Sequence, residues 1–598
     1  MLRFAQTADA IAATTSKLSK TSLVADYIRS LPPDQAAIAA IFLSGRPFAA
    51  YEETTLQVGG SLLWRIISEL SGKSEHQLTE LYRRYGDAGG VAAAALPQKP
   101  EAILSLADVQ RAFAGIAAAR GPAAKAHILR QLLERATPLE AKYIVKIISG
   151  DLRIGLKESL VEEAIARAFA APLAQVQRAN MLLGDIGETL RLAAAGKLAE
   201  ARLRLFHPIG FMLASPVDSA EKALSEFPNA AVEDKYDGIR AQAHIGHGEV
   251  RLFSRTRDEF TESFPELVPA LHAIPHEAIL DGEIVAWSCG ADPPRAKAEG
   301  APARESERSS ANGCALPFST LQQRLGRKKV SVKLMRQVPI AYLVFDVVYA
   351  DGELLLERPL RERAAILDRL LTHLGAAQDT TTPMAAPRPA QSSFAFAAQL
   401  APPATVLRAP VATAHSPADL EQLFVAARQR GNEGLMIKDL DSLYTPGRRG
   451  KSWFKMKREL ATLDVVVTAV EYGHGKRIRV LSDYTFAVWD GDRLVNIGKA
   501  YSGLTDAEIA EMTKWFLAHK VSGQGLRLEV EPKIVLEVAF NNMMRSARHE
   551  SGYALRFPRI LRLRPDKLPE DADSIESAKE IFERQHRSSG PFFRTPKN

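Results

Sequence analysis

The spacing of apolar residues changes near residue 205, and this change limits the folds open to the chain. Upstream, segments such as "SLVEEAIARAF" repeat apolar residues at helical spacing, and Ser159 followed by Glu162 predicts a capped helix start. Downstream, short apolar runs such as "AILDGEIVAW" and "IAYLVFDVVYADG" are bounded by Gly and Asp, which is typical of strands. A chain of 598 residues is also too long for one hydrophobic core. We therefore expect a helical domain followed by strand-rich domains.

The same patterns predict three domains. We expect an all-α domain over residues 1–204, an antiparallel-rich α/β domain over 205–459 and an all-β domain over 460–598. In the last domain, strands with Gly-rich turns precede a helix that Thr505 caps, with Glu508 as its reciprocal partner. Short strands with one helix suit a small barrel of the OB type, and a Greek-key sandwich fits the pattern as well.

Two insertions interrupt the central domain, near residues 288–315 and 375–405. The first contains no Val, Ile, Leu or Phe, and the second is rich in Ala, Pro, Thr and Gln. Neither can bury enough apolar surface to offset its ordering entropy, so both are predicted to be disordered surface loops. Cys289 and Cys314 bracket the first insertion. Two cysteines cannot form a disulfide framework or a four-cysteine zinc site, and we interpret them as unpaired thiols.

Charge and hydropathy restrict the partners and the location of the protein. The formal net charge is +7 and the sequence pI is about 9.1, which favours a polyanionic partner without deciding it. No apolar run approaches the roughly 20 residues that cross a bilayer, and the first residues lack the apolar core of a signal peptide. We expect a soluble, cytoplasmic protein with no membrane contact.

The segment "VEDKYDGIRAQAH" (232–244) places a lysine where an apolar strand ends. Lys235 is followed by the turn signal Asp237-Gly238 and then by Arg240. Two interpretations are open: a surface lysine in a hairpin, or a nucleophile at the end of a rigid strand. A lysine that attacks phosphorus must first lose its proton, and nearby cations lower the cost of that loss.

Other segments supply the cations and carboxylates that such chemistry needs. Alternation along "SWFKMK" puts Lys455 and Lys457 on one face of a strand. Asp281 and Glu283 in "LDGEIV", and Glu433 in "NEGLMIK", lie at predicted strand starts. Two carboxylates on separate strands can hold a Mg²⁺ ion with its waters, and this ion neutralises phosphates in nucleotide enzymes. Taken alone, each motif is more common as a hairpin, a strand end or a solvated edge.

The order of the motifs is more specific than any one of them. It resembles the order in the covalent-lysine nucleotidyltransferases, which include ligases and capping enzymes: "KYDGIR", "LFSRTRDEF", "LDGEIV", "VFDVVY", "EGLMIK", "SWFKMK" and "RFPRILRLRPDK". Three longer segments resemble the ATP-dependent DNA ligases of the archaeal and eukaryotic type: "PFSTLQQRLGRK", "YTPGRRGKSWFKMK" and "RSARHESGYALRFPRILRLRPDK". "KYIVKIISGDLRIGLKE" resembles the N-terminal helical DNA-binding domain of those ligases. The resemblance covers the chain from about residue 140 onward.

The resemblance implies a role for each matching residue at the nucleotide. Lys235 becomes the nucleophile that carries AMP. Glu233 accepts a hydrogen bond from the adenine amino group, and Phe345 stacks on the base. Without the motif order, an apolar strand makes simple core packing an equal alternative for Phe345. Arg240 and Arg255 hold the ribose and phosphate, and later the 5′-phosphate of the nick.

The resemblance also assigns residues to the metal and the phosphates. Glu283 contacts the ribose or the metal, and Glu433 contacts the metal. The cations that neutralise the α-phosphate are Arg449, Lys455 and Lys457. The residues that orient the leaving pyrophosphate are Arg564, Asp566 and Lys567.

These roles imply an ATP-dependent DNA ligase with Mg²⁺, or alternatively Mn²⁺, acting as a monomer on nicked double-stranded DNA in replication, repair or recombination. A ligase of this kind would be associated with the nucleoid. It would pass AMP from lysine to the 5′-phosphate and release AMP when the nick is sealed. A capping guanylyltransferase would lack the large helical domain, and an RNA ligase would be shorter. An NAD-dependent ligase would need a zinc-finger set of cysteines. A non-catalytic nucleic-acid clamp is the alternative from another class, and Lys235, Glu283, Glu433 and Lys455 argue against it.

Overall fold

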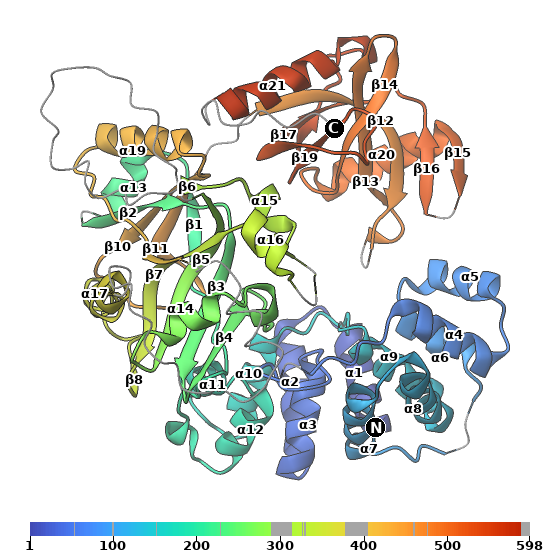
Figure 1. Cartoon of the computed structure of the whole chain (residues 1–598). Coiled ribbons are helices and arrows are strands. Elements are labelled where there is room, and N and C mark those ends of the chain that lie inside the picture. The colour runs from blue at the N-terminus through green and yellow to red at the C-terminus, as the bar shows by residue number, and fades with distance from the viewer. Residues whose placement is uncertain are drawn as a thin grey trace, which may run out of the picture. The chain divides into compact units, whose positions relative to one another are not determined.

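The computed structural model describes most of the chain. The described residues are 1–52, 54–98, 101–150, 152–227, 229–288, 314–325, 327, 330–376, 405–457, 461–474, 477–524 and 526–587. Contacts within the chain define two compact units (Figure 1). The first comprises Met1–Ile209 with His474–Arg479, and the second comprises Gly210–Gly473 with Val480–Asn598. Each unit is described by itself below.

The first unit is helical. Its α-helices are α1 (Leu2–Ala13), α2 (Lys17–Arg29), α3 (Pro33–Leu43), α4 (Gly60–Ser71), α5 (Glu75–Tyr85), α6 (Ala88–Ala95), α7 (Leu106–Ala118), α8 (Pro122–Arg135), α9 (Pro138–Ile148), α10 (Glu158–Ala168), α11 (Leu173–Leu183) and α12 (Ile186–Ala194). Edge-to-face contacts of Phe4 with Tyr27, Phe42 and Tyr143 join four helices in one core. This aromatic packing stabilises the unit beyond the burial of area alone.

The predicted cap of helix α10 is wrong. The helix begins at Glu158 after Lys157, so Ser159 lies inside its first turn and caps nothing. Glu162 accepts a hydrogen bond from Asn180 of α11 at 2.8 Å instead of reaching back to the helix start. A tertiary contact has therefore replaced the local one that the sequence pattern predicts.

Buried lysines hold the bend around "SGDLRIGLKE". Lys20 Nζ donates to the carbonyl oxygen of Ile154 at 2.5 Å, and Lys146 Nζ donates to that of Leu152 at 3.1 Å. Both lysines are only 6% exposed. Arg153 has a left-handed backbone (φ 51°) and donates to the carbonyl oxygen of Gly86 at 2.7 Å. Some basic residues near this bend therefore support its backbone and do not lie on a solvated helix face.

The second unit begins with two sheets that carry the predicted central domain. The first has the strand order β1 (Leu213–Val217), β11 (Arg449–Met456), β10 (Gly434–Asp439), β2 (Ala230–Lys235). The second has the order β4 (Glu249–Ser254), β3 (Ile239–Gly246), β5 (Ala278–Ser288), β7 (Ile340–Ala350), β8 (Glu353–Leu354), with β6 (Cys314–Ala315) on β5 and β9 (Thr405–Arg408) on β7. Among these pairs only β1–β11 and β7–β9 are parallel.

Helices cover the sheets with separate hydrophobic cores. Residues of α13 (Ala220–Glu226) and α19 (Pro417–Gln429) share a buried cluster with the first sheet. Residues of α14 (Leu267–His272), α15 (Phe318–Gln322), α16 (Val332–Gln337) and α17 (Leu360–Ala376) pack in the cluster of the second sheet. Helix packing on one face of each sheet leaves the other face free to carry polar chemistry.

The C-terminal part of the second unit is rich in strands. One sheet has the order β14 (Arg493–Ala500), β13 (Leu481–Asp490), β12 (Ala461–Tyr472), β16 (Arg527–Val530), β15 (Lys520–Gln524), and β17 (Val535–Phe540) pairs with β12 and with β20 (Arg559–Leu563). A hairpin of β18 (Asn542–Arg545) and β19 (Tyr553–Arg556) and the helices α20 (Asp506–Ala518) and α21 (Ile575–Arg587) complete it. Thr505 caps α20 in a capping box with Glu508, as predicted.

The predicted fold class is confirmed: an all-α part, an antiparallel-rich α/β part and a strand-rich C-terminal part occur in that order. Residues 289–313 and 377–404, on which the predicted disordered loops fall, lie outside the described residues, as does Cys289. Cys314 is exposed and forms no disulfide. Within the described ranges, no helix is long and apolar enough to span a bilayer.

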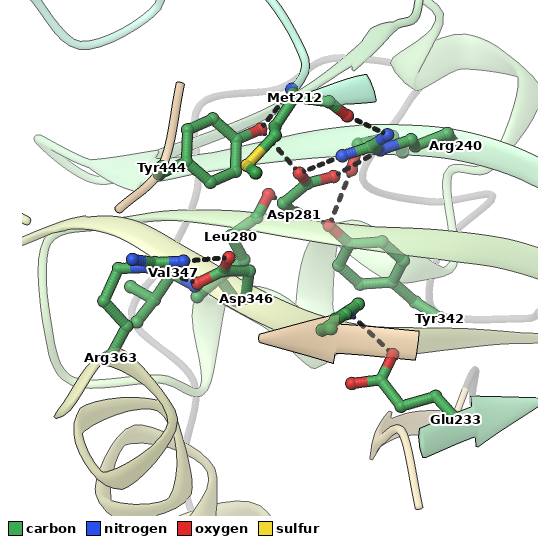
Figure 2. A network of polar contacts seen from close by, with 12 residues as sticks. Met212, Glu233, Arg240, Leu280, Asp281, Tyr342, Asp346, Val347, Arg363 and Tyr444 are labelled. Atoms are coloured by element: carbon green, nitrogen blue, oxygen red, sulfur yellow. Dashed lines mark hydrogen bonds and ion pairs between the residues drawn. The ribbon is translucent and has the colours of Figure 1, made fainter. Parts of the chain in front are cut away.

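A buried ion pair ties α17 to β7. Arg363 donates two hydrogen bonds to the Asp346 carboxylate, at 2.8 and 2.9 Å, and both side chains are 0% exposed. Asp346 also accepts from the backbone N–H of Val347 at 2.9 Å (Figure 2). Charges removed from water at this depth are tolerated because each is paired and hydrogen-bonded.

We predict that Arg363→Met lowers the free energy of unfolding by about 3–5 kcal/mol, because it leaves the Asp346 carboxylate buried without its cation. Urea unfolding followed by circular dichroism measures the change. Arg358→Met is the matched control, since Arg358 pairs with Glu353 at the surface, where ion pairs contribute about 0–1 kcal/mol. Equal losses for the two variants would contradict the prediction.

Candidate active site

Strand alternation directs one set of side chains of the first sheet to the same face. Glu233 and Lys235 are two residues apart on β2, so they point to the same face of the sheet. Glu233 is paired with Met436 of β10 in the strand register. Met436 is in turn paired with Lys455 of β11, and Lys438 of β10 with Trp453 of β11. Cross-strand partners lie on the same side of a sheet, so this face carries a lysine or a carboxylate on every one of these three strands.

The second sheet faces this set with charged residues of its own. Arg240 of β3 is paired with Glu283 of β5 in the strand register. Phe345 of β7 lies between two cations of different sheets: Lys438 Nζ is 4.1 Å from the ring centroid and the Arg240 guanidinium carbon is 5.3 Å from it. These distances bring the two sheets together around one ring. We refer to Glu233, Lys235, Arg240, Asp281, Glu283, Glu433 and Lys438 as the inter-sheet charge cluster.

Lys235 meets Glu433 at the edge of the cluster. Its Nζ lies 2.5 Å from Glu433 Oε2, and each side chain is 22% exposed. The backbone N–H of Glu433 donates to the carbonyl oxygen of Lys235 at 2.8 Å, so both ends of the pair are fixed. Gly434 follows in a left-handed conformation (φ 150°), and a Cβ there would collide with the Met456 carbonyl oxygen. Position 434 therefore requires glycine because of its backbone conformation, while Glu433 before it supplies the carboxylate that pairs with Lys235.

Asp234, the residue before Lys235, forms an ion pair that helps to position the end of β2 and the start of β10. Arg430 donates two hydrogen bonds to the Asp234 carboxylate at 2.7 and 2.8 Å, and Asn432 Nδ2 donates a third at 2.8 Å. Asp234 directly precedes Lys235, and Asn432 directly precedes Glu433. The lysine and the carboxylate are thus held together from both strands.

Arg240 donates three hydrogen bonds to two partners (Figure 2). It donates two hydrogen bonds to the fully buried Asp281 carboxylate, at 3.0 and 2.7 Å, and one to the Met212 carbonyl oxygen at 2.6 Å. The Tyr444 hydroxyl donates to the same carboxylate at 2.7 Å. Burial alone would lower the pKa of Arg240, but the Asp281 charge raises it, so this cation is permanent.

Glu283 differs from the other carboxylates of the cluster. Burial raises its pKa to about 7, and the attraction of Lys235 and Arg240 only partly opposes this. At Glu433 the neighbouring charges outweigh burial. Burial acts to raise the pKa of Glu433, but the adjacent Lys235 and Lys457 hold it below the ordinary value. Glu283 forms no ion pair among the described residues, so it is the carboxylate that would gain most from an added cation.

Further cations gather beside Lys235. Burial lowers the pKa of Lys455, and the positive charges of Lys457, Arg449, Lys235 and Arg255 lower it further. Repulsion of this kind needs proximity, so β11, the end of β2 and the turn after β4 contribute to one positive region. Such a region suits a group with several negative charges, such as a nucleotide triphosphate.

The sequence analysis did not assign a role to three buried residues of the site, Lys438, Tyr444 and Trp453. Lys438 is 1% exposed and donates to Glu233 Oε2 at 2.6 Å. Burial lowers the pKa of Lys438, although the charge of Glu233 acts to raise it. Trp453 and Tyr444 enclose the same region, with ring centroids 6.0 Å apart. Alternation along "EGLMIK" contains the missing signal, because Gly434, Met436 and Lys438 share one strand face.

The structure does not bring every predicted site residue into the cluster. Arg564 pairs with Asp464 at 2.9 Å and with Asp566 at 2.7 Å, and Lys567 pairs with Asp464 at 2.7 Å. Within the described part of the chain, these ion pairs all lie among residues of the C-terminal, strand-rich part. Glu233, Arg240, Glu283, Phe345, Glu433 and Lys455 do surround Lys235 or its neighbours.

Comparisons with known proteins agree with the motif order. Family models described as "DNA ligase N terminus", "ATP dependent DNA ligase domain" and "ATP dependent DNA ligase C terminal region" match residues 1–166, 211–457 and 477–567. A probable DNA ligase of Koribacter versatilis is 57% identical over 589 residues, which covers 98% of this chain and 97% of the relative. The chain belongs to the ATP-dependent DNA ligase family. The predicted family and enzyme class are thereby confirmed.

Other members of the ATP-dependent DNA ligase family are more distant. A DNA ligase of the archaeon Methanothrix thermoacetophila is 35% identical, with 98% of this chain and 99% of the relative covered. The solved structure named Pmar-Lig_PreS3 matches with a TM-score of 0.57 at 16% identity, over 94% of this chain and 99% of that one. At that identity the structural match concerns the fold alone, and it agrees with the order of helical, α/β and strand-rich parts. Membership of the family makes ATP the nucleotide substrate.

We predict that Glu283→Gln changes how the stability of the nucleotide-free ligase depends on pH. The pKa of Glu283 is raised from 4.5 to about 7 in the folded protein, so between these values the folded state binds a proton that the unfolded state has lost. Wild-type stability therefore falls, relative to the variant, as pH rises through this window. Urea unfolding in the presence of a chelator at several pH values measures the difference. The exposed Glu262→Gln is the control, and a difference that is constant with pH would refute the prediction.

Proposed function

We propose that this ligase seals nicks in double-stranded DNA through an AMP group carried by Lys235. The observation that supports this most directly is the position of Lys235 at a strand end, 2.5 Å from a carboxylate and beside the positive region of Lys455. A phosphate monoester has no good leaving group, so a nick can be joined only after its 5′-phosphate has been activated. A lysine held between cations and carboxylates is suited to transfer the activating group.

Three displacements complete the reaction. Lys235 Nζ, once it has lost a proton, bonds to the α-phosphorus of ATP, and the bond to the β-phosphate oxygen breaks to release pyrophosphate. The 5′-phosphate of the nick then attacks the same phosphorus, and the P–N bond breaks as the lysine nitrogen takes back a proton. Finally the 3′-hydroxyl attacks the activated 5′-phosphate, loses its proton and expels AMP. Each step passes through a phosphorus centre whose charge the surrounding cations stabilise.

We assign the remaining residues by their position relative to Lys235. Glu233 lies deeper on the same strand and recognises the base, with Phe345 as the stacking surface. Arg240 and Arg255 contact ribose and phosphate. The positive region formed with Arg449, Lys455 and Lys457 binds the α-phosphate, since these cations already repel one another without a bound anion.

Glu283 and Glu433 are the residues that would hold Mg²⁺, or Mn²⁺. The donor set fits, because both are carboxylates whose charges act on each other, and Glu283 forms no ion pair in the described structure. No group of three His, Cys, Asp or Glu side chains suited to a metal occurs among the described residues, so water and phosphate oxygens would complete the shell. Such an ion neutralises phosphate charge. On binding it, Glu433 would no longer hold Lys235 Nζ, so this nitrogen would be free to approach phosphorus.

The other parts of the chain support DNA binding and the release of pyrophosphate. We propose that the helical unit binds nicked duplex DNA by its phosphates and that the ligase acts as a monomer. Arg564, Asp566 and Lys567 would orient the pyrophosphate, and to do so Arg564 and Lys567 must exchange Asp464 for the phosphate.

We predict that Lys235→Ala and Lys235→Arg each reduce transfer of labelled AMP to the protein by on the order of 1,000-fold or more. Arginine keeps the charge but cannot act as a neutral nucleophile. Mass spectrometry of the protein after incubation with ATP, and sealing of nicked DNA compared with nicked RNA, measure the two stages. GTP and NAD are tested beside ATP.

The matched control for this test is Lys222→Arg, which changes an exposed lysine of α13 in the same unit. It should carry AMP and seal nicks as the wild type does. Uptake of AMP by the Lys235→Arg variant would show that another residue is the nucleophile.

We predict that residues 210–598 alone still react with ATP at Lys235 but bind nicked DNA more weakly than the full chain. Each phosphate that a cation neutralises releases counterions, so loss of the helical unit should also make binding less dependent on salt. Fluorescence anisotropy of a nicked duplex over a series of salt concentrations gives both quantities. Equal affinity and an equal salt slope for the two proteins would contradict a DNA-binding role of the helical unit.

A further inference from the structure

Lys438 occupies an unusual place for a lysine. Its side chain is 1% exposed near the end of β10, and its Nζ donates to Glu233 Oε2 at 2.6 Å, with Glu233 itself 5% exposed. Lysine is almost never fully buried unless it is paired, and burial of an ion pair carries a desolvation cost of several kcal/mol for each ion. The position therefore calls for a reason beyond strand formation.

Strand pairing does not provide that reason. Six consecutive residue pairs already join β2 and β10, from Gly434 with Lys235 to Asp439 with Ala230. The direct neighbour of Lys438 across this ladder is Ala231, and that of Glu233 is Met436, so the ion pair runs diagonally between the strands. Replacement of a buried ion pair by apolar residues is often neutral or stabilising, so stability alone is a weak explanation for it.

Two aromatic rings restrict where Lys438 Nζ can lie. The Nζ is 4.1 Å from the ring centroid of Phe345 and 4.5 Å from that of Trp453. A cation at these distances is attracted to both ring faces. The ammonium group is thus fixed by two rings, and it fixes in turn the carboxylate that it binds.

Within the described part of the chain, the other oxygen of Glu233 has no hydrogen-bond partner. Among the described residues, Lys438 is the one hydrogen-bond donor to this carboxylate, and it bonds to Oε2. An ionised carboxylate accepts hydrogen bonds and donates none, so Oε1 can accept a hydrogen bond from a ligand. Glu233 lies two residues from Lys235 on the same strand face, about 6.6 Å along the strand. A nucleotide whose α-phosphorus meets Lys235 can therefore place its base at Glu233.

We propose that Lys438 determines nucleotide specificity by fixing the orientation of the Glu233 carboxylate, so that Oε1 accepts from the exocyclic amine of adenine. Guanine presents a carbonyl oxygen at the same ring position, and two acceptors facing each other leave both unpaired at a cost in binding. Lys438 contacts Glu233 and not the base, so it is a positioning residue. The inference rests on the proposed transfer of AMP to Lys235 and extends it to the choice of base.

The test measures the rate of lysyl-nucleotide formation with labelled ATP and with labelled GTP in the full-length ligase. Lys438→Met keeps the length of the side chain and removes its charge. We expect its kcat/KM for ATP to fall at least about 10-fold while that for GTP does not fall, because a site built to hydrogen-bond a substrate N–H loses discrimination when that bond is lost. Lys438→Arg restores a cation and should recover part of the ATP preference.

A second set of variants separates specificity from folding. Arg324→Met breaks the buried pair with Glu266, whose side chains are 0% and 3% exposed, in the hydrophobic core of the second sheet. Arg324→Met should change the kcat/KM values for ATP and for GTP by the same factor, so their ratio should stay as in the wild type. In the Glu233→Gln background, Lys438→Met should change the ATP to GTP ratio no further, because the group through which it acts is already altered. This double variant also removes both charges, so it keeps the test open if Lys438→Met alone does not fold.

The outcomes distinguish this inference from the proposed function. An unchanged ATP to GTP ratio in Lys438→Met, with a changed ratio in Glu233→Gln, would overturn the role of Lys438 and leave base recognition by Glu233 intact. A further change of the ratio on adding Lys438→Met to Glu233→Gln would also overturn it. A wild-type ligase that forms no covalent nucleotide at Lys235 would refute the proposed function itself.

Discussion

Charges removed from water must be paired, and this constraint governs the central part of the ligase. Its two sheets turn charged side chains toward each other, and the deepest of them occur as pairs: Lys438 with Glu233 and Arg240 with Asp281. Each pair is held by at least one further group, an aromatic ring for Lys438 and a tyrosine hydroxyl for Asp281. Glu283 forms no ion pair among the described residues, and burial raises its pKa, so it could accept an added cation.

The paired charges also give the site a direction. Exposure rises along β2 from Glu233, at 5%, to Lys235, at 22%, and Arg255 and Lys457 lie exposed beyond it. A nucleotide that follows this gradient would lay its base among buried, fixed partners and its phosphates among partly solvated cations. Base recognition benefits from the buried end at Glu233, where an unpaired hydrogen-bonding group is costly. Phosphate transfer benefits from the cations at the exposed end, near Lys235.

Sequence reasoning worked best where a property is local. The capping box of Thr505 and Glu508 depends on residues three apart and was found. The same rule failed at Ser159, because Glu162 has a better partner in Asn180, which belongs to another helix. Lys146 similarly lies among residues that predict a solvated helix face, yet it is buried against the Leu152 carbonyl oxygen. A pattern cannot include a partner that the chain brings near only by folding.

The sequence by itself determined the order of helical, α/β and strand-rich parts, the family and the lysine on which the chemistry is proposed to depend. Those properties follow from periodicity and from motifs whose residues are close in the chain. Only the tertiary structure decided that Lys438 holds Glu233, that Asp281 binds Arg240 and Tyr444, and that burial raises the pKa of Glu283. These are contacts between residues that different strands contribute, and the pKa of a buried group depends on the charges and the water that all of those strands bring to it or exclude.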